Sequence, residues 1–166
     1  FMIKNFIFDM GNVLVDFSPD YILSKYTSDL ETIRLLKELI FYHTYWLRLD
    51  NGDISFEDAA TQIKKDAPET YHEIIDDVLK TWHLHKTERL DMTDLVETIK
   101  EKGFPIYLLS NAAARFHEYK DDYKVFGFFD GLIISADYQM SKPETSIYEV
   151  VLDTYDLKPE ECLFID

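Results

Sequence analysis

Four short apolar runs constrain the fold of this chain more than any other feature of its sequence. They cover residues 3–8, 105–109, 132–134 and 163–165. Each run is continuous rather than alternating, which is typical of parallel strands that are covered on both faces of a sheet. We therefore expect a parallel sheet with helices on both of its sides.

Helical patterns separate the later runs. Apolar residues recur at helical spacing before Gly103, a candidate C-cap, and again after Pro143, which the first turn of a helix tolerates. The recurring residues are Leu95, Val96 and Ile99 in the first pattern and Ile147, Val150, Val151 and Tyr155 in the second. Strands that alternate with helices predict a doubly wound parallel α/β sheet.

Residues 16–86 do not alternate in this way. They predict an all-helical module inserted after the first strand, so that residues 1–15 and 87–166 form an α/β core domain. Ser55 with Asp58 is similar to a capping-box helix start, and a further helix follows Pro68. The module has one long apolar stripe of Leu30, Ile33, Leu36, Leu39, Ile40, His43, Trp46 and Leu47, and its last helix has Ile74, Val78 and Trp82.

The charge of the chain limits its partners. It has 17 basic and 32 acidic residues and a formal net charge of −15, so we expect it to repel nucleic acids and anionic lipid surfaces. No apolar run reaches the about 18 residues of a membrane span, and no signal peptide is evident. The single Cys162 excludes an internal disulfide framework and predicts a reducing, cytoplasmic setting.

Asp166 is the last residue of the sequence and follows the fourth predicted strand directly. No later residue would cover that strand or its acidic end. We therefore expect the natural chain to continue, with the C-terminal end of the core following Asp166.

Polar side chains stand at or just beyond the end of each predicted strand. They are Asp9, Ser110 with Asn111, Lys142 and Asp166. Because the carboxyl ends of parallel strands share one edge of a sheet, where ligands bind, we expect these side chains to lie close together. Two carboxylates can share Mg²⁺, which prefers oxygen ligands, and one of them can attack phosphorus. A hydroxyl and an ammonium can bind the oxygens of the transferring group.

The segments around these residues resemble the four motifs of the haloacid dehalogenase-like hydrolase superfamily. The motifs are Phe8-Asp9-Met10-Gly11-Asn12-Val13, Leu108-Leu109-Ser110-Asn111, Ser141-Lys142-Pro143 and Phe164-Ile165-Asp166. The resemblance implies a Rossmann-like core with a helical cap, which corresponds to residues 16–86, and residues 51–55 resemble a cap-loop segment. The first motif is most similar to that of bacterial sugar-phosphate phosphatases of the glucose-1-phosphate type.

The resemblance implies a Mg²⁺-dependent phosphomonoester hydrolase that acts on a small soluble phosphate, such as a sugar phosphate. Asp9 would be the nucleophile, forming an aspartyl-phosphate, and would bind Mg²⁺ together with the Gly11 carbonyl and Asp166. Lys142 would also neutralise Asp9. The phosphate site would comprise Ser110, Asn111, Lys142, Gly11 and Asn12. The natural substrate and the oligomeric state stay open.

One departure from the first motif leaves the reaction open. Most phosphatases of the superfamily have a second Asp, the general acid and base, where this chain has Gly11. A 2-haloacid dehalogenase, which would use Asp9 against carbon, lacks that Asp, and a phosphate-binding regulatory protein with little turnover does not need it. Asp16, at the entrance of the helical module, is a candidate proton donor, and the alternative is a solvated hinge residue.

The other polar and aromatic candidates favour structural roles. The five His residues have no metal-ligand spacing on one helix face, and Arg48 and Arg115 are typical cations near helix ends. We expect Tyr42, Tyr45 and Trp46 in the core of the helical module, where one of them could line a substrate pocket.

Overall fold

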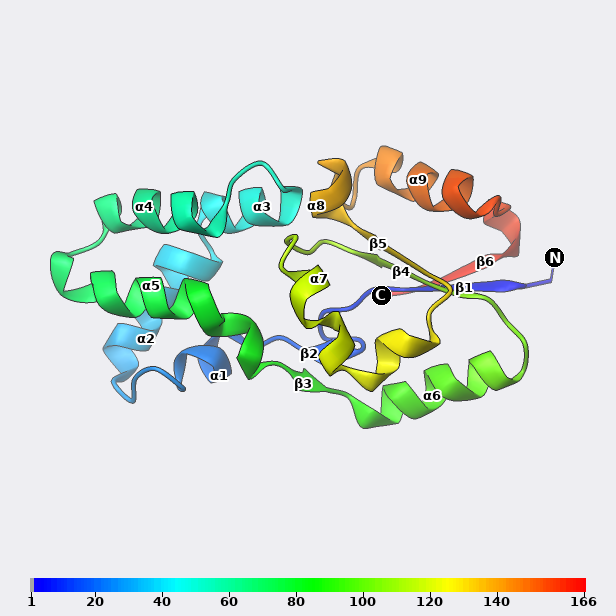
Figure 1. Cartoon of the computed structure of the whole chain (residues 1–166), viewed down its shortest axis with the longest axis horizontal. Coiled ribbons are helices and arrows are strands. Elements are labelled where there is room, and N and C mark those ends of the chain that lie inside the picture. Colours follow the sequence, from blue (N-terminus) through cyan, green and yellow to red (C-terminus); the bar gives the residue numbers. More distant parts are fainter. Residues whose placement is uncertain (1) are drawn as a thin grey trace.

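The computed structural model describes residues 2–166 and is built on a four-stranded parallel sheet (Figure 1). In spatial order the strands are β5 (Gly131–Ile134), β4 (Ile106–Ser110), β1 (Asn5–Phe8) and β6 (Cys162–Ile165). Every neighbouring pair is parallel, and Phe8 lies between Leu108 and Ile165. The four predicted strands and the α/β class are thus confirmed.

Different helices cover the two faces of this sheet (Figure 1). Successive residues of a strand point to opposite faces. Phe8 therefore packs into the cluster that includes α6 (Leu90–Glu101), whereas Ile7 packs into a second cluster with α9 (Thr145–Tyr155). Both side chains are buried. Because both alternating sets of side chains are buried, the strands are continuous apolar runs in the sequence.

The sequence correctly predicted where α6 ends but not where α9 begins. Gly103 follows α6 with a φ of +85°, the left-handed conformation of a C-cap glycine. Pro143, however, precedes α9, which begins at Thr145, so its predicted place in the first helical turn is wrong. The residues before α9 form a turn instead, in which Glu144 N–H donates to the Ser141 carbonyl. Other connections contain α7 (Phe116–Tyr119), η4 (Lys120–Asp122), η5 (Lys124–Phe128), α8 (Ser135–Tyr138) and η6 (Pro159–Glu161).

Residues 19–85 form a block of helices, which we call the helical insert. Its elements are α1 (Pro19–Leu23), α2 (Leu30–Leu36), η1 (Lys37–Phe41), α3 (Thr44–Asn51), α4 (Phe56–Asp66), η2 (Glu69–Tyr71), α5 (His72–Thr81) and η3 (Trp82–His85). The Ser55 side chain accepts a hydrogen bond from Asp58 N–H at the start of α4, as predicted. None of the helices between residues 2 and 166 is long and apolar enough to cross a membrane.

The predicted stripe from Leu30 to Leu47 is not the face of one helix. α2 gives way to the π-helical turn η1, and the helix breaks at Tyr42 before α3 begins. Residues before and after this break therefore do not share a face. Leu30 and Leu47, the first and last residues of the predicted apolar stripe, are 78% and 68% exposed.

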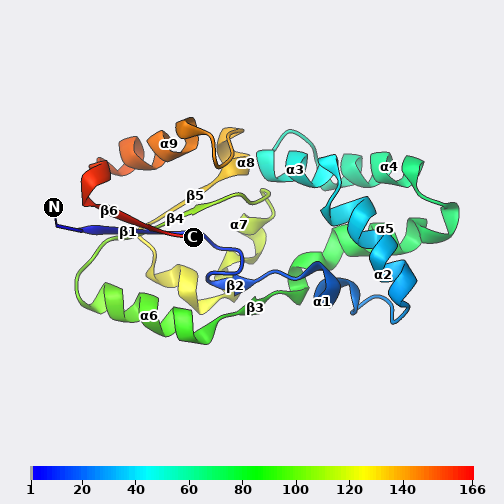
Figure 2. The same cartoon turned by 180° about the vertical axis from the view of Figure 1, so that it is seen from behind.

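A two-stranded antiparallel ribbon joins the helical insert to the rest of the chain. β2 (Val15–Asp16) pairs with β3 (Thr87–Glu88). The prediction that residues 16–86 are all helical is therefore wrong at Asp16, which belongs to β2. Figures 1 and 2 both show the ribbon at one edge of the molecule and the contact of α3 with α8 at the opposite edge. The division into a core domain and a cap stays a prediction.

Candidate active site

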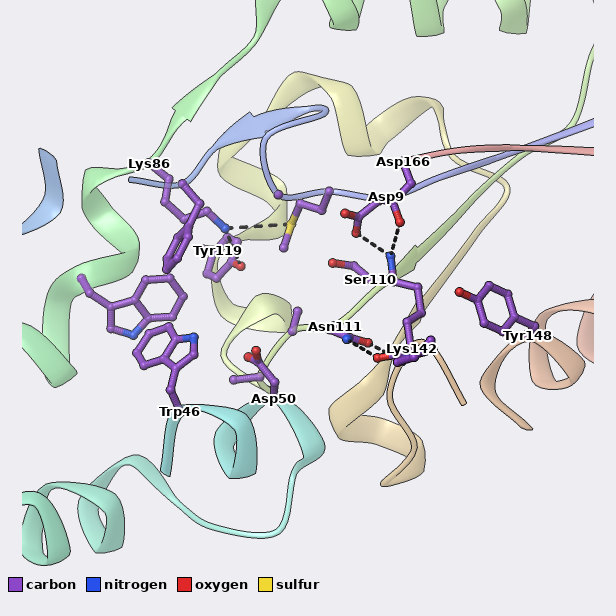
Figure 3. A pocket seen from close by; sticks show the side chains of 17 residues that line it. Asp9, Trp46, Asp50, Lys86, Ser110, Asn111, Tyr119, Lys142, Tyr148 and Asp166 are labelled. Carbon is purple, nitrogen blue, oxygen red and sulfur yellow. Dashed lines mark hydrogen bonds and ion pairs between the residues drawn. The ribbon is translucent and has the colours of Figure 1, made fainter. Parts of the chain in front are cut away.

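A cavity of about 440 Å³ lies between the carboxyl edge of the sheet and the helical insert. The sheet side contributes Asp9, Ser110, Asn111, Lys142 and Asp166, together with Gly11. The other side contributes Phe17, Trp46, Asp50, Trp82 and Lys86. Figure 3 shows these two groups of side chains facing each other across the cavity. All the predicted strand-end residues thus line one cavity, although they are far apart in the sequence.

The Lys142 ammonium lies against two carboxylates. Its Nζ is 3.0 Å from Asp9 Oδ1 and 3.6 Å from Asp166 Oδ2. The sheet register explains this arrangement, because Phe8 pairs with Ile165 and the following residues, Asp9 and Asp166, leave adjacent strands together. The side chains of Lys142 and Asp9 are only 10% and 17% exposed. Their ion pair is therefore largely shielded from bulk water.

Asn111 fixes the backbone of Lys142. Its Oδ1 accepts a hydrogen bond of 2.8 Å from Lys142 N–H, and its Nδ2 donates one of 3.0 Å to the Lys142 carbonyl. The amide of Asn111, predicted to bind phosphate, is thus engaged in positioning the lysine. The position of Ser110 is set by the sheet itself, because Ser110 is the last residue of the inner strand β4 and is buried beside the cavity. Figure 3 shows its hydroxyl below Asp9.

Asn12 is the predicted phosphate-binding residue that the structure places elsewhere. Its Oδ1 accepts a hydrogen bond from Phe17 N–H, and its own N–H donates to the Val15 carbonyl. It lines a separate surface recess together with Asp16. With φ at +57°, Asn12 shapes the turn that leads into β2, a local role that suits Asn in a left-handed conformation.

The chemistry of the sheet-edge oxygens suits a hard cation. Asp9 and Asp166 supply two carboxylates that approach one point, and Gly11 lines the same end of the cavity. Mg²⁺ takes such oxygen ligands and keeps several waters. Among residues 2–166, no group of three or more His, Cys, Asp or Glu side chains is arranged to hold a metal ion. A metal at this edge would therefore use a backbone carbonyl, and that of Gly11 fits the donor set.

Asp16 and Gly11 are the two positions that bear on the missing proton donor. Asp16 lies outside the cavity, where its Oδ1 is 2.6 Å from Arg89 Nε and its side chain is 50% exposed. The structure therefore favours the alternative interpretation of Asp16 as a half-exposed residue of the ribbon that joins the helical insert to the rest of the chain. Gly11 has open space around it, because a Cβ placed there would meet no atom within 4 Å.

Asp50 and Lys86 are cavity residues that sequence reasoning missed. Asp50 is the penultimate residue of α3, and Lys86 stands between η3 and β3. Burial of its carboxyl group raises the pKa of Asp50 to about 7, although the Lys86 charge and the Ala113 N–H lower it. Burial lowers the pKa of Lys86 to about 8, although the charges of Asp50 and Asp9 raise it. No local sequence pattern predicts that either residue lies in the cavity, because the burial of both depends on tertiary packing.

The surroundings of Lys86 are aromatic rather than acidic. Its Nζ is 3.1 Å from the Tyr119 hydroxyl and lies over the Tyr119 and Trp82 rings, at 4.8 and 5.6 Å from their centroids. The Trp46 and Trp82 rings are 5.0 Å apart, and Phe17 packs against both. This part of the cavity therefore combines one half-buried cation and one half-buried carboxyl group with an apolar wall.

Three further candidates lie away from the cavity. Tyr42 is 62% exposed, Arg48 is paired with Asp53, and Arg115 donates to the backbone carbonyls of α5. Trp46 is the member of the predicted aromatic group that reaches the cavity. Burial and close ring contacts, rather than sequence spacing, distinguish it from Tyr42.

Comparison with known proteins supports the family suggested by the motifs. Residues 3–166 match the model of the haloacid dehalogenase-like hydrolases. The chain is 29% identical to a sesquiterpene phosphatase from Aspergillus oryzae over 164 residues, which are 98% of this chain and 80% of that protein.

Solved structures share the fold at lower sequence identity. A haloacid dehalogenase family enzyme from Bacteroides thetaiotaomicron, in complex with magnesium and inorganic phosphate, matches with a TM-score of 0.77 and 22% identity, over 99% of this chain and 84% of that one. A dehalogenase matches with a TM-score of 0.74 and 18% identity, over 99% of this chain and 76% of that one. At these identities the likeness extends to the fold and not to the reaction.

Proposed function

Because this chain belongs to the haloacid dehalogenase-like hydrolase family, we propose that it is a Mg²⁺-dependent phosphatase of small phosphomonoesters. The observation that carries the proposal is the Lys142 ammonium between the carboxylates of Asp9 and Asp166. A cation and two carboxylates at one sheet edge suit an anionic group that is held beside a metal ion. A relative with a phosphatase name and a fold neighbour in complex with magnesium and phosphate support the same chemistry.

In this proposal Asp9 is the nucleophile. Its carboxylate attacks phosphorus in line with the ester oxygen and forms an aspartyl-phosphate, which water then hydrolyses. Lys142 and the Ser110 hydroxyl bind the phosphoryl oxygens, and Asn111 holds the backbone of Lys142 in register. Mg²⁺, held by Asp9, Asp166 and the Gly11 carbonyl, would neutralise charge on the transferring group. The helical insert acts as a cap that excludes bulk water from the reaction.

The apolar wall of the cavity favours a leaving group with an apolar face. Trp46 lines the end of the cavity that lies away from Asp9 and Lys142 in Figure 3, and the rings of Trp82 and Phe17, which also line the cavity, pack against it. A sugar ring offers an apolar face for stacking, and an isoprenoid alcohol, of the kind that the name of the Aspergillus oryzae relative suggests, offers a larger one. A panel with sugar phosphates, prenyl alcohol phosphates and nucleotides, compared by kcat/KM, distinguishes these leaving groups.

The Asp9→Asn variant tests the proposed reaction. It should lower phosphate release from p-nitrophenyl phosphate by at least ~10³-fold, because it removes the nucleophile and one metal ligand. Asp16→Asn is the matched control, since Asp16 is a surface carboxylate outside the cavity. Chelation of divalent ions should abolish turnover, and added Mg²⁺ should restore it.

Two results would contradict the proposal. One is activity of the Asp9→Asn variant within tenfold of the wild-type value. The other is an absence of phosphate release from the whole panel with Mg²⁺ present. Halide release from a 2-haloacid without metal would instead support the dehalogenase alternative.

A further inference from the structure

The proposed phosphatase needs a group that protonates the leaving alkoxide, and Gly11 has no side chain that can do this. Of the described residues, three that line the cavity have carboxyl groups: Asp9, Asp166 and Asp50. The first two lie against Lys142 at the phosphate end. Asp50 stands apart from them, on the helical insert, and Figure 3 shows its carboxyl group pointing into the cavity from the opposite wall.

The position of Asp50 is fixed by contacts with residues outside the helical insert, which we call the sheet domain (residues 2–15 and 87–166). The Ala113 N–H, in the loop that follows Ser110 and Asn111, lies close enough to favour the charged form of the Asp50 carboxyl group and so to lower its pKa. The backbone carbonyl of Asp50 accepts a hydrogen bond from the hydroxyl of Ser135, which is fully buried and also accepts one of 2.9 Å from Ala112 N–H. Ser135 of α8 thus binds the backbone of Asp50 and is itself bound by the loop that leads from the phosphate site.

The contact of α3 with α8 reinforces this arrangement. Gly52 caps α3 with φ at +74°, and its Cα faces the Ala136 carbonyl so closely that a Cβ would lie 2.3 Å from that oxygen. Ser141 Oγ donates to Asn51 Oδ1 at 3.2 Å. The two residues that follow Asp50 at the end of α3 therefore both contact the segment of residues 135–141, which gives the preorganisation that a proton-transfer group needs.

We propose that Asp50 is the general acid and base of this enzyme, in the role that a second aspartate would have at position 11. The inference rests on the proposed phosphatase function and adds a residue and a wall of the cavity to it. Asp50 would act from the helical insert, so that its proton is delivered only while the insert is seated on the sheet domain.

The proposed reaction has two steps, each with one proton transfer at Asp50. An Asp9 oxygen forms a bond to phosphorus while the bond from phosphorus to the ester oxygen breaks, and that oxygen takes the Asp50 proton to leave as an alcohol. Asp50, now a carboxylate, then removes a proton from the water that attacks the aspartyl-phosphate. The bond between phosphorus and Asp9 breaks, phosphate leaves, and Asp50 is again protonated.

The surroundings of Asp50 suit both steps. A general acid works best when its pKa lies near the operating pH, and burial raises the pKa of Asp50 to about 7. The titratable groups that face it are Lys86 beside β3, Tyr119 of α7 and, beyond Lys86, Asp9. Burial raises the pKa of Tyr119 well above its usual range, so the phenol stays protonated at neutral pH. Lys86 therefore supplies the charge that keeps the carboxylate form of Asp50 accessible.

The decisive experiment compares leaving groups in Asp50→Asn and wild-type enzyme with Mg²⁺. A good leaving group, p-nitrophenolate, needs no proton, whereas an alkoxide does. We expect Asp50→Asn to lower kcat/KM for alkyl phosphates by ~10²-fold or more but to lower that for p-nitrophenyl phosphate by less than about tenfold. Asp53→Asn is the control, because Asp53 lies three residues away, pairs with Arg48 and does not line the cavity.

A second measurement needs no turnover. The ¹³C chemical shift of the Asp50 carboxyl carbon, followed by NMR against pH in the metal-free protein, should titrate well above the ordinary range of aspartate. The thermal unfolding midpoint of Asp50→Asn, measured alongside, establishes that the variant is folded. If it is not, Asp50→Ser replaces it in the leaving-group series.

The outcomes separate the two proposals. An equal loss for aryl and alkyl phosphates, or a normal titration of Asp50, overturns the role of Asp50 while wild-type phosphatase activity stands. A wild-type protein that releases phosphate from no ester overturns the proposed function, and the role of Asp50 falls with it. Selective loss of alkyl phosphate turnover, with an elevated titration, supports both.

Discussion

Lys142 balances the charge of two carboxylates at the phosphate end of the cavity. Lys142→Met keeps the length and apolar contacts of the side chain but removes the ammonium that would face the phosphoryl oxygens. We expect the rate with p-nitrophenyl phosphate to fall by about 10²–10³-fold, the usual loss for one electrostatic donor of a transition state. Lys102→Met, on an exposed residue after α6, is the control. A rate within threefold of wild type would show that Lys142 serves only the turn before α9.

Gly11 is the position where a carboxylate can be added without a steric conflict. Its φ is not in the left-handed region, and a Cβ there meets no atom within 4 Å. Gly11→Asp should therefore restore alkyl phosphate turnover in the Asp50→Asn background by at least about tenfold, because it provides a second proton donor at the cavity. Gly11→Asn, of equal size but unable to transfer a proton, is the control. Equal activity of the two double variants would contradict a shortage of proton donors.

The sequence predicts one half of the candidate site and not the other. Asp9, Ser110 and Asp166 could be found because they stand at or directly after the ends of strands, and Lys142 because it lies in the connection after β5; parallel strands bring their ends to one edge. Asp50 could not be found from the sequence, because a single carboxylate near the end of a helix is common on protein surfaces. Its role depends on the packing of α3 against α8, which no local pattern specifies.

At the scale of elements, the junction of α3 with α8 depends on Gly52. Gly52→Ala would place a methyl group 2.3 Å from the Ala136 carbonyl oxygen, at a φ of +74°. We expect the variant to lose about 1–3 kcal/mol of unfolding free energy, as for strained left-handed positions, or to release α3 from α8 with a lower kcat for alkyl phosphates. Urea unfolding and steady-state kinetics measure the two effects.

Gly127→Ala is the matched control for this prediction. A Cβ at Gly127 meets no atom within 4 Å, and its φ is not positive. Its stability should therefore stay within about 0.5 kcal/mol of wild type, as for most surface substitutions. If Gly52→Ala behaves in the same way in both assays, the seating of α3 does not depend on this close approach.

Strands were easier to predict than helix boundaries in this chain. A strand buried on both faces, such as β4 with all five residues buried, leaves a continuous apolar run that no turn interrupts. The helices of the insert share apolar residues whose spacing continues across breaks, so the π-helical turn η1 and the break at Tyr42 were hidden. The ribbon of β2 and β3 was missed because two residues per strand are too few for a pattern.

At the scale of the whole molecule, Asp50 and Lys86 link folding stability to pH in opposite directions. The folded-state pKa of Asp50 is raised to about 7, because folding favours the protonated carboxyl group. The contribution of Asp50 to the free energy of unfolding is therefore complete below about pH 4 and is lost as the pH rises to about 7. The folded-state pKa of Lys86 is lowered to about 8, because folding favours the neutral amine. The contribution of Lys86 to the free energy of unfolding is therefore complete above about pH 10.5 and is lost as the pH falls to about 8. The pair therefore stabilises the fold least between pH 7 and 8.

This prediction is tested with Asp50→Asn and Lys86→Met in urea unfolding at pH 4.5, 7.5 and 9.5. Relative to wild type, Asp50→Asn should gain stability between pH 4.5 and 7.5, because the neutral amide does not lose a proton. Lys86→Met should gain at least as much at pH 4.5 as at pH 7.5, and less at pH 9.5, because the stabilising contribution of Lys86 is lost at every pH below about 8. Differences that do not change with pH would show that neither group titrates in the folded protein at a shifted pKa.

Both chain crossings between the sheet and the helical insert run side by side in β2 and β3, at one edge of the molecule. Because both connections lie at one edge, a rotation of the insert about that edge would stretch neither of them. Lys86, next to one of these connections, would move little, whereas Asp50, at the far edge, would sweep through the widest arc. The alcohol end of the cavity would then open while the sheet edge that binds phosphate stays whole. We therefore expect an ordered release in which the alcohol departs first and phosphate last, so that phosphate is a competitive product inhibitor and the alcohol is not.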